Sequence, residues 1–519
     1  MNQHQRNLAP QGSDPIPAIA GDYVTEQPME SAEVVARPLL TPAEIRTILI
    51  SLLLAMFLSA LDQTIVATAL PTIGRQFRDT ANLSWVITAY LLASTAVAPV
   101  FGSLSDIYGR RATIIVALSL FMIGSVACAL APNLSVLIVA RGLQGLGGGG
   151  ILPIVQTIIS DIVLPRDRGK YQAYFSATWV SAGIGGPVVG GLFAEHLHWS
   201  MIFWINIPLG IGALALLLPN MKKIPTYHRR RAVDWLGGGL LMLSAVVFLL
   251  VLTWGGTRFS WVSPTIIAMS GAAFVLAAAF IVHARNAEEP FLPLPLMGGT
   301  VVPYAMASGG FAIGAMVALT VHMPSYYEAV YRLTASEAGL ALIPLVAISV
   351  PGSWIAGWTM MRTLHYKRVA IAGTSLAAAM AATLAIATPM PLWALLTLLS
   401  LFAFGLGTTF PVNIVSIQNA VARTQVGTAT GAMNFFRALM ASFMVAAFTT
   451  ILLMALGGAA PGLGEGGSGA SVAADSMVGA FRYVFAAAAL LLAGSAVSLV
   501  LMEERPLAGG SVAPAEMAE

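Results

Sequence analysis

The sequence predicts an all-α membrane protein, and three observations support this prediction. Of the 519 residues, 57% are hydrophobic and only 9% are charged, whereas soluble domains carry about 25% charged residues. The mean hydropathy is +0.81, so the chain has more apolar surface than a water-soluble core could bury, and its solvent is lipid. The apolar residues lie in runs of about 20, the length with which a helix spans a bilayer. The net charge of +3 is too small to indicate a nucleic-acid partner.

The first spanning helix is preceded by a polar segment. Residues 1–44 contain no apolar run and predict a disordered cytoplasmic tail. At its end, residues 41–44 (Thr-Pro-Ala-Glu) predict a helix start, with a Thr cap, Pro in the first turn and Glu closing a capping box.

Fourteen apolar runs of spanning length follow this helix start. They lie at residues 45–69, 83–104, 112–131, 134–160, 172–194, 199–219, 233–254, 263–285, 302–327, 337–361, 367–387, 391–415, 427–457 and 477–502. The run 199–219 is the weakest, because it is short and Pro208 interrupts it.

The lysines and arginines between the runs predict the orientation. With the N-terminus inside, the inner loops hold fifteen of these residues and the outer loops hold four. Since basic residues concentrate on the cytoplasmic side, both termini are expected in the cytoplasm. The inner set is Arg110, Arg111, Arg166, Arg168, Lys170, Lys222, Lys223, Arg229, Arg230, Arg231, Arg285, Arg362, Lys367, Arg368 and Arg423, and the outer set is Arg75, Arg78, Arg258 and Arg332.

The longest basic loop separates the first six runs from the rest, the last six runs begin near residue 302, and a pair lies between them. This plan of six, two and six suggests two bundles with a cavity between them. The expected organisation is a tail (1–44), a six-helix bundle (45–219), a basic cytoplasmic loop (220–232), an inserted helix pair (233–285), a cytoplasmic linker (286–301), a second six-helix bundle (302–502) and a cytoplasmic tail (503–519).

The loop after the second run combines a tight turn with one carboxylate and two cations, Gly102-Ser-Leu-Ser-Asp-Ile-Tyr-Gly-Arg-Arg111. Such a cluster can pair with neighbouring helix ends in one conformation and release them in another. Alternatively, it is a solvated turn that follows the positive-inside rule. The loop resembles the signature loop of the major facilitator superfamily over all ten residues, which favours the first interpretation. We therefore predict a conformational latch formed by Gly102, Asp106, Gly109, Arg110 and Arg111.

Three further segments resemble the drug:proton antiporter branch of that superfamily, which has fourteen transmembrane helices. They are Leu61–Pro71 around an intramembrane Asp, Arg141–Gly147 with an intramembrane Arg, and Gly183–Gly191, a glycine-proline motif typical of antiporters. The resemblance extends from about residue 45 to about residue 500 and is looser in the second half. It implies the major facilitator fold, with two six-helix bundles and two extra central helices.

The resemblance also implies a function. We expect a secondary transporter and not an enzyme, which works as a monomer in the bacterial cytoplasmic (inner) membrane. It would export small, largely apolar or cationic compounds in exchange for protons by alternating access. The proton gradient would drive it, so no cofactor or metal is expected.

Asp62 is the only carboxylate deep inside a predicted span. A charge at that depth costs about 2.5–3.5 kcal/mol, so it is a functional candidate by default. Arg141 lies at the same depth, since each residue is seven positions from the outer end of its span, roughly 10 Å. We predict proton coupling by Asp62 with Arg141 as its partner; the alternative is a fixed salt bridge between two helices.

Two glycine-rich stretches predict close helix packing, or a bendable seam that limits proton leak. The first covers residues 145–150, just below Arg141. The second is the antiporter motif, with Gly183, Gly186, Pro187, Gly190 and Gly191.

Four residues of the second bundle are candidates for the cavity or the substrate site. Arg437 and Asn434 lie one turn apart in a span, and an intramembrane Arg lines a cavity or pairs with a carbonyl. His322 and Glu328 end another span; His322 could carry protons, or it is an interfacial histidine beside aromatic residues. Asp234 is most simply the cap of the following helix.

Three other functions remain to be weighed. A proton-coupled exporter of one metabolite, such as an amino acid, sugar or siderophore, would share this fold. A membrane enzyme would need a buried nucleophile–base pair or a metal cluster, but Cys128 is the only cysteine and the seven histidines are scattered. A channel would need rings of acidic or amide residues, which the sequence lacks.

Overall fold

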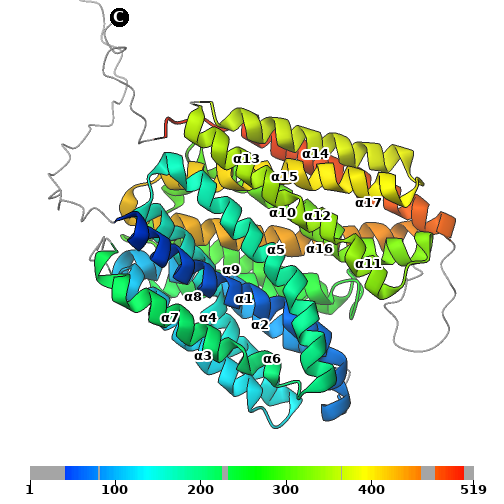
Figure 1. The fold of residues 1–519 in the computed structure, drawn as a ribbon, viewed down its shortest axis with the longest axis horizontal. Helices are drawn as coiled ribbons and strands as arrows, with labels where there is room; N and C mark the ends of the chain where they lie inside the picture. The colour runs from blue at the N-terminus through cyan, green and yellow to red at the C-terminus, as the bar shows by residue number, and fades with distance from the viewer. Residues whose placement is uncertain (1–40, 80–81, 225–231, 364, 458–473, 508–519) are drawn as a thin grey trace, which may run out of the picture. The chain divides into compact units, whose positions relative to one another are not determined.

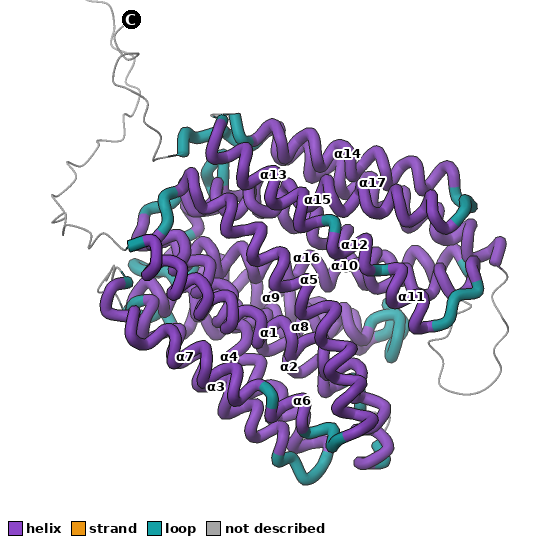
Figure 2. The backbone as a smooth tube through the Cα atoms, viewed as in Figure 1, coloured by secondary structure: helices purple, strands orange, loops and turns teal. Residues whose placement is uncertain are grey.

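The computed structural model describes residues 41–79, 82–224, 232–363, 365–457 and 474–507. The predicted tails fall largely outside this part of the chain, as does most of the predicted basic loop 220–232. The described residues form helices joined by loops (Figure 2). Fourteen of these segments are long and apolar enough to cross a membrane, which confirms the predicted number of spans.

The first six spans, which we call the first bundle, contain eight helical segments. These are α1 (Pro42–Phe77), α2 (Trp85–Tyr108), α3 (Arg110–Ala129), α4 (Leu134–Ile162), α5 (Pro165–His196), α6 (Met201–Trp204), α7 (Asn206–Leu217) and the 3-10 helix η1 (Leu218–Lys223). The span predicted at 199–219 is broken at Ile205, and not at Pro208. Pro208 lies in the first turn of α7, where its missing N–H leaves no hydrogen bond unmade.

The extra pair is α8 (Trp235–Trp254) and α9 (Pro264–Asn286), followed by the 3-10 helix η2 (Leu294–Met297). The last six spans, the second bundle, contain α10 (Val302–Tyr331), α11 (Ala335–Ala341), α12 (Ile343–Ala347), α13 (Ser349–Arg362), α14 (Lys367–Ala387), α15 (Leu392–Ala420), η3 (Arg423–Gln425), α16 (Val426–Ala455) and α17 (Ala474–Leu501). The span predicted at 337–361 is therefore divided among α11, α12 and α13.

Side-chain caps begin several helices as the sequence predicts. Thr41 and Glu44 form the reciprocal capping box of α1. Asp234 accepts hydrogen bonds from the N–H of Gly237 in α8, the N–H of Phe291 and the His283 ring of α9. Burial opposes ionisation of this carboxyl, but the three donors outweigh it and lower its pKa below the ordinary value. Asp234 therefore caps α8 and also ties it to α9.

Each bundle is held by its own helix pairs (Figure 1). In the first bundle α4 packs on α2 and α3, and α1 packs on α5 and α7. In the second, α10 packs on α16 and α17, and α14 packs on α15 and α17. The extra helices pack on each other, and α8 also contacts α2 and α16. The pair thus lies beside the junction where these two helices of different bundles meet.

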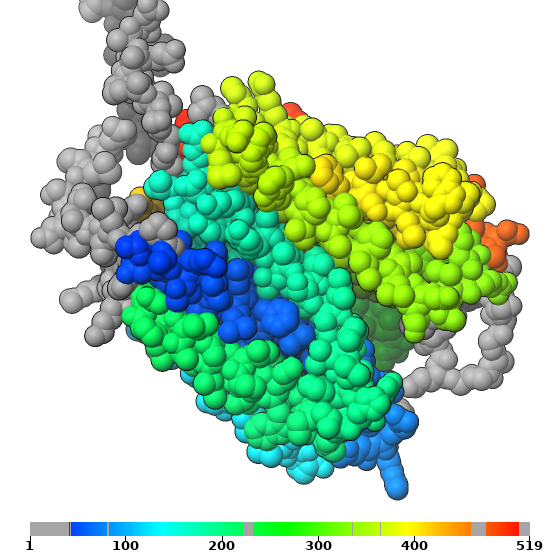
Figure 3. All heavy atoms as spheres, in the orientation of Figure 1, coloured from blue at the N-terminus to red at the C-terminus, as the bar shows by residue number. Residues whose placement is uncertain are grey.

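The bundles contact each other through α2 with α16 and α5 with α13. The close approaches lie near the helix ends that carry Arg110, Arg166 and Arg423, which we call the basic end. A methyl group built on Gly102 would lie 2.4 Å from the Gly427 carbonyl oxygen, and one built on Gly357 would lie 2.4 Å from that of Gly169. In the space-filling view α5 and α13 touch near this end, and deeper atoms become visible between the bundles further along (Figure 3).

The glycines of α4 permit the packing that positions the site below. A methyl group on Gly149 would lie 2.1 Å from the backbone oxygen of Ser94 in α2. One on Gly147 would lie 2.3 Å from the backbone nitrogen of Phe121 in α3. Real side chains do not approach so closely, so only glycine lets α4 contact both neighbours backbone to backbone. The predicted close packing of residues 145–150 is confirmed.

Candidate functional site

A cluster of polar side chains is sealed inside the first bundle. Arg141 Nη1 of α4 donates to Asp62 Oδ2 of α1 at 2.6 Å. The Asp62 side chain is fully buried, and only 2% of the Arg141 side chain is exposed. The two residues that equal depth in the sequence suggested as partners are therefore an ion pair. The distance is that of a strong charge-assisted hydrogen bond.

Two amides complete the shell around the Asp62 carboxylate. Gln144 Nε2 donates to Asp62 Oδ1 at 2.8 Å, and Asn206 Nδ2 of α7 donates to the same oxygen at 2.9 Å. Ser125 of α3 accepts from both amides. Four helices thus converge on one carboxylate, which has three donors for its ionised form.

Arg141 is held on its other sides by α2. Its Nε donates to the Val86 carbonyl at 3.0 Å, and its guanidinium lies 4.4 Å from the centre of the Tyr90 ring. The ring face is an electron-rich partner for a cation. A change in the charge of Asp62 would therefore act through Arg141 on the contact between α4 and α2.

Sequence reasoning missed Gln144 and Asn206 as members of this cluster. Gln144 stands inside the segment Arg141–Gly147 but was given no role of its own. Asn206 lies in a span that is otherwise apolar, and a lone amide at membrane depth is a signal that could have been followed. Its Oδ1 atom is buried without a hydrogen-bond partner among the described residues.

The predicted latch residues meet at the basic end. Arg110 Nη1 donates to Asp106 at 2.6 Å, and Arg110 Nε donates to Asp161 of α4 at 2.9 Å. Asp106 also accepts from the backbone N–H of Gly427 and from both the N–H and the hydroxyl of Thr428. Asp106 therefore joins the first bundle to the N-terminal turn of α16, where a carboxylate is favoured.

The remaining latch residues have separate contacts. Arg111 donates to the Ile224 carbonyl at 2.5 Å, and Gly109 has a φ of 87° between α2 and α3. This left-handed conformation favours glycine. Asp161 was missed because it stands one residue beyond the predicted span 134–160.

The antiporter motif is divided between two faces of α5. Gly186 and Gly190 pack against Thr64, Ile65 and Thr68 of α1. Gly183 and Gly191 have open space where a side chain would be, and Pro187 is exposed. The prediction of close packing thus holds for Gly186 and Gly190 but is wrong for Gly183 and Gly191. Residues four apart share one face of a helix, so positions 183, 187 and 191 form a different face from positions 186 and 190.

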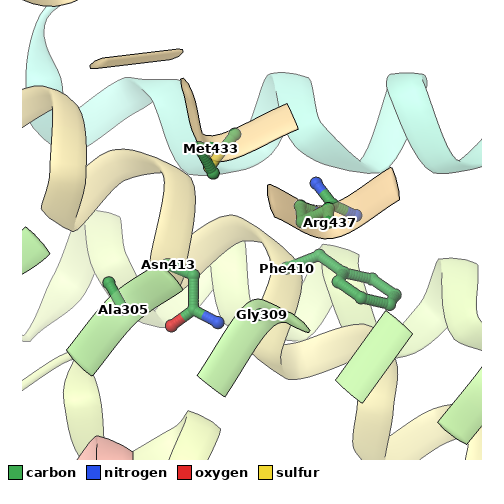
Figure 4. A pocket seen from close by; sticks show the side chains of 6 residues that line it. All are labelled: Ala305, Gly309, Phe410, Asn413, Met433 and Arg437. Atoms are coloured by element: carbon green, nitrogen blue, oxygen red, sulfur yellow. The ribbon is translucent and has the colours of Figure 1, made fainter. Parts of the chain in front are cut away.

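A small cavity lies in the second bundle beside α16. It is lined by Ala305, Gly309, Phe410, Asn413, Met433 and Arg437 (Figure 4). Of the four residues predicted for the cavity or substrate site, Arg437 is the one that lines it.

The other three predicted cavity residues lie elsewhere. Asn434 Nδ2 donates to Gln156 Oε1 of α4 at 2.7 Å, which joins the two bundles. His322 is hydrogen-bonded to the Ala318 carbonyl and to Thr449 of α16. Glu328 is exposed near the end of α10.

Two helical bundles that meet at one end are the architecture of many membrane transporters. The family model described as Major Facilitator Superfamily matches residues 52–445. The chain belongs to this superfamily, so it is a membrane transporter and not an enzyme.

Similar proteins named as transporters occur in fungi and bacteria. Efflux pump dotC of Dothistroma septosporum is 34% identical over 409 residues, which cover 78% of this chain and 70% of the pump. Multidrug resistance protein 3 of Bacillus subtilis is 31% identical over 413 residues, 79% of this chain and 80% of that protein. Multidrug transporter protein MdtP of Bacillus subtilis is 30% identical over 407 residues, which cover 77% of this chain and 74% of that protein.

Solved structures agree on the fold. The human organic anion transporter MFSD10 aligns with a TM-score of 0.60 at 13% identity, over 89% of this chain and 100% of that one. The proton:xylose symporter XylE aligns with a TM-score of 0.60 at 15% identity, over 88% and 95%. At these identities the likeness concerns the fold alone.

Proposed function

We propose that the protein is a proton-coupled exporter of small, largely apolar or cationic compounds that works by alternating access. The observation that carries this proposal is the sealed carboxylate Asp62, which accepts hydrogen bonds from Arg141, Gln144 and Asn206. The relatives named as efflux pump and multidrug transporter support the direction and the breadth of transport.

Protonation of Asp62 would change the forces among four helices. The ionised carboxylate attracts Arg141 and accepts from two amides, whereas the neutral acid loses the attraction and must donate a hydrogen bond. Rotation of the Asn206 amide would turn its unpartnered Oδ1 toward that proton. Binding and release of one proton would thereby shift the packing of α1, α4 and α7.

The proton site and the cavity share no residue, so coupling between them must pass through helices. Helix α4 is a candidate connection because it carries both Arg141 and Gln156, fifteen residues apart, or about 22 Å. Gln156 accepts from Asn434 of α16, one turn from Arg437. A shift of α4 at the proton site would therefore reach the helix that lines the cavity.

The two bundles are joined at the basic end through Asp106 and Thr428. Because basic residues favour the cytoplasmic side, we infer that this end faces the cytoplasm and that this conformation is open to the outside. Breaking the Asp106 contacts would let the bundles part at the cytoplasmic end and admit the next substrate.

The test is uphill export from cells that lack their own efflux pumps, measured over a panel of compounds with and without a proton uncoupler. Wild type should export part of the panel only while the proton gradient lasts. Asp62→Asn, which fixes the side chain neutral, should insert normally but lose uphill export, and Asp62→Glu should keep part of it. Uncoupler-sensitive export by Asp62→Asn would show that the proton binds elsewhere.

A further inference from the structure

The guanidinium of Arg141 lies beside two aromatic rings from different helices. It is 4.4 Å from the centre of the Tyr90 ring of α2 and 5.7 Å from the centre of the Phe203 ring of α6. Both aromatic residues are buried. A cation within about 6 Å of a ring centre is attracted to the electron-rich face of the ring. Burial strengthens this attraction, because water does not compete for the cation.

The position of the Tyr90 ring depends on two glycines of α4. A methyl group built on Gly148 would lie 2.2 Å from the Tyr90 hydroxyl oxygen, and one built on Gly145 would lie 2.6 Å from the Tyr90 backbone oxygen. The Tyr90 hydroxyl lies 3.3 Å from the hydroxyl of Ser59 in α1. Contacts with α1 and α4 thus hold the ring beside the guanidinium.

Protonation of Asp62 in the proposed cycle would leave Arg141 as a buried cation without an anion. An arginine does not lose its proton in a protein, so its charge remains when the carboxyl becomes neutral. Among the described residues, Asp62 is the carboxylate with which Arg141 pairs, and its other hydrogen bonds go to the neutral carbonyl groups of Val86 and Gln144. A buried charge that loses its partner is costly, so other groups must hold the cation at this stage.

The two rings attract the cation whether or not Asp62 carries a proton. When the carboxylate is ionised, its negative charge lies close to the guanidinium and offsets part of the electric field at the rings. When the carboxyl is neutral, this offset is lost and the rings experience the full field of the cation. The attraction between the rings and Arg141 should therefore be largest in the protonated state.

We propose that Tyr90 and Phe203 are positioning residues of the proton site, whose rings hold the Arg141 guanidinium in place while Asp62 is protonated. The inference rests on the proposed role of Asp62 as the proton site, and it assigns neither ring a contact with the substrate.

Thermal unfolding of the purified full-length chain in detergent tests this role with fluorinated rings at position 90. Site-directed incorporation would replace Tyr90 with phenylalanine or with a trifluorinated phenylalanine, in which fluorine withdraws electrons from the ring face. The fluorinated ring should lower the melting temperature relative to phenylalanine. The loss should be greater in Asp62→Asn, which fixes that side chain neutral, than in the chain with native Asp62. Equal losses in the two backgrounds would overturn the proposal.

Uphill export in proteoliposomes with a fixed proton gradient is the second measurement. Tyr90→Phe keeps a ring beside Arg141 and should keep most of the export rate. Tyr90→Leu and Phe203→Leu each remove a ring and should lower the rate by about tenfold, or ~1.4 kcal/mol. The trifluorinated ring should give a rate between those of Tyr90→Phe and Tyr90→Leu. A rate equal to that of Tyr90→Phe would mean that the ring only fills space, and the proposal would fail.

Phe121 of α3 provides the matched control. It is fully buried in the same bundle and packs against Gly147 of α4, and no cation of the described part of the chain lies over its ring. A trifluorinated ring at position 121 should lower the melting temperature equally in both backgrounds and leave export close to that of the wild type. The same background dependence at positions 121 and 90 would contradict the role assigned to Tyr90.

The two measurements separate this inference from the proposed function. Uncoupler-sensitive export together with equal fluorine effects in both backgrounds would overturn the role of the rings alone. A larger fluorine effect in Asp62→Asn, without uncoupler-sensitive export by the wild type, would overturn proton coupling alone.

Discussion

At the scale of single residues, three buried carboxylates of the first bundle are each paired with a buried arginine. Asp62 is matched by Arg141, and Asp106 and Asp161 share Arg110. Such pairs keep their charges only if every partner stays in place, because a buried ion that loses its partner costs several kcal/mol. The amides around Asp62 are therefore as important as Arg141 for the form that the carboxyl adopts.

Replacing Asn206 should test the role of these amides. Asn206→Leu removes a hydrogen bond to the ionised carboxylate, worth about 1.5 kcal/mol or somewhat more. The carboxylate then keeps two of its three donors, so the initial rate of uphill export should fall by up to about tenfold. The measurement is the initial export rate in proteoliposomes with a fixed proton gradient.

Ser125→Ala is the graded control for Asn206→Leu. Within the described part of the chain, Ser125 accepts from Asn206 and Gln144 but makes no hydrogen bond to Asp62, so its removal should lower the export rate less. A wild-type export rate in Asn206→Leu would mean that Asn206 is only a packing residue.

At the scale of elements, helix α4 connects the sealed cluster around Asp62 to the contacts between the two bundles. It carries Arg141 and Gln144 of the sealed cluster, Asp161 of the latch and Gln156 of the contact with α16. The glycines between them let α2 and α3 approach its backbone. Loss of that approach would displace all three functional contacts at once.

Two glycines of α4 provide a matched pair for this idea. A methyl group on Gly149 would lie 2.1 Å from the Ser94 oxygen, whereas one on Gly142 would have nothing within 4 Å. Gly149→Ala should destabilise the protein by about 1–3 kcal/mol through overpacking, and Gly142→Ala should be neutral or stabilising by up to about 1 kcal/mol. Thermal unfolding in detergent, followed by size-exclusion fluorescence, measures both. Equal melting of the two variants would refute the packing argument.

At the scale of the whole molecule, the junction at the basic end decides which face is open. Asp106→Asn keeps the size of the side chain but removes the charge that pairs with Arg110 and that accepts from the first turn of α16. The bundles should then separate more often at this end. Spin labels at Leu164→Cys and Thr363→Cys should report a longer mean distance, and export should fall sharply.

Asp167→Asn is the control for the latch. Asp167 lies at the same end, in the first turn of α5, and makes no cross-bundle hydrogen bond among the described residues. It should leave both the distance and the export unchanged. The native Cys128 is fully buried, so labels should not reach it. If distances and export are both normal in Asp106→Asn, the loop Gly102–Arg111 serves only to orient the chain in the membrane.

The orientation of the molecule follows from the same basic residues. A membrane-impermeant maleimide applied to intact cells should modify Ser260→Cys, in the exposed loop after α8, but not Leu164→Cys at the basic end. Both positions should react in permeabilised cells. Labelling of Leu164→Cys alone in intact cells would show that the basic end faces outward. This result would contradict both the proposed topology and the proposed direction of transport.

The sequence by itself determined the class of fold, the number of spans and the pair Asp62–Arg141. It could do so because a bilayer imposes a length on every apolar run and a high cost on every buried charge, and both are local properties. Depth along a helix follows from residue count, so a pair at equal depth was predictable without knowing how the helices are rotated.

Only the tertiary structure decided what depends on rotation and on contacts between distant segments. Asn206 lies 144 positions from Asp62, and Thr428 lies 322 positions from Asp106, so no local pattern links them. Gly183 and Gly186 share one motif, yet one faces open space and the other faces α1. Burial and pairing depend on the neighbouring helices, and the order of residues along the chain does not show which helices become neighbours.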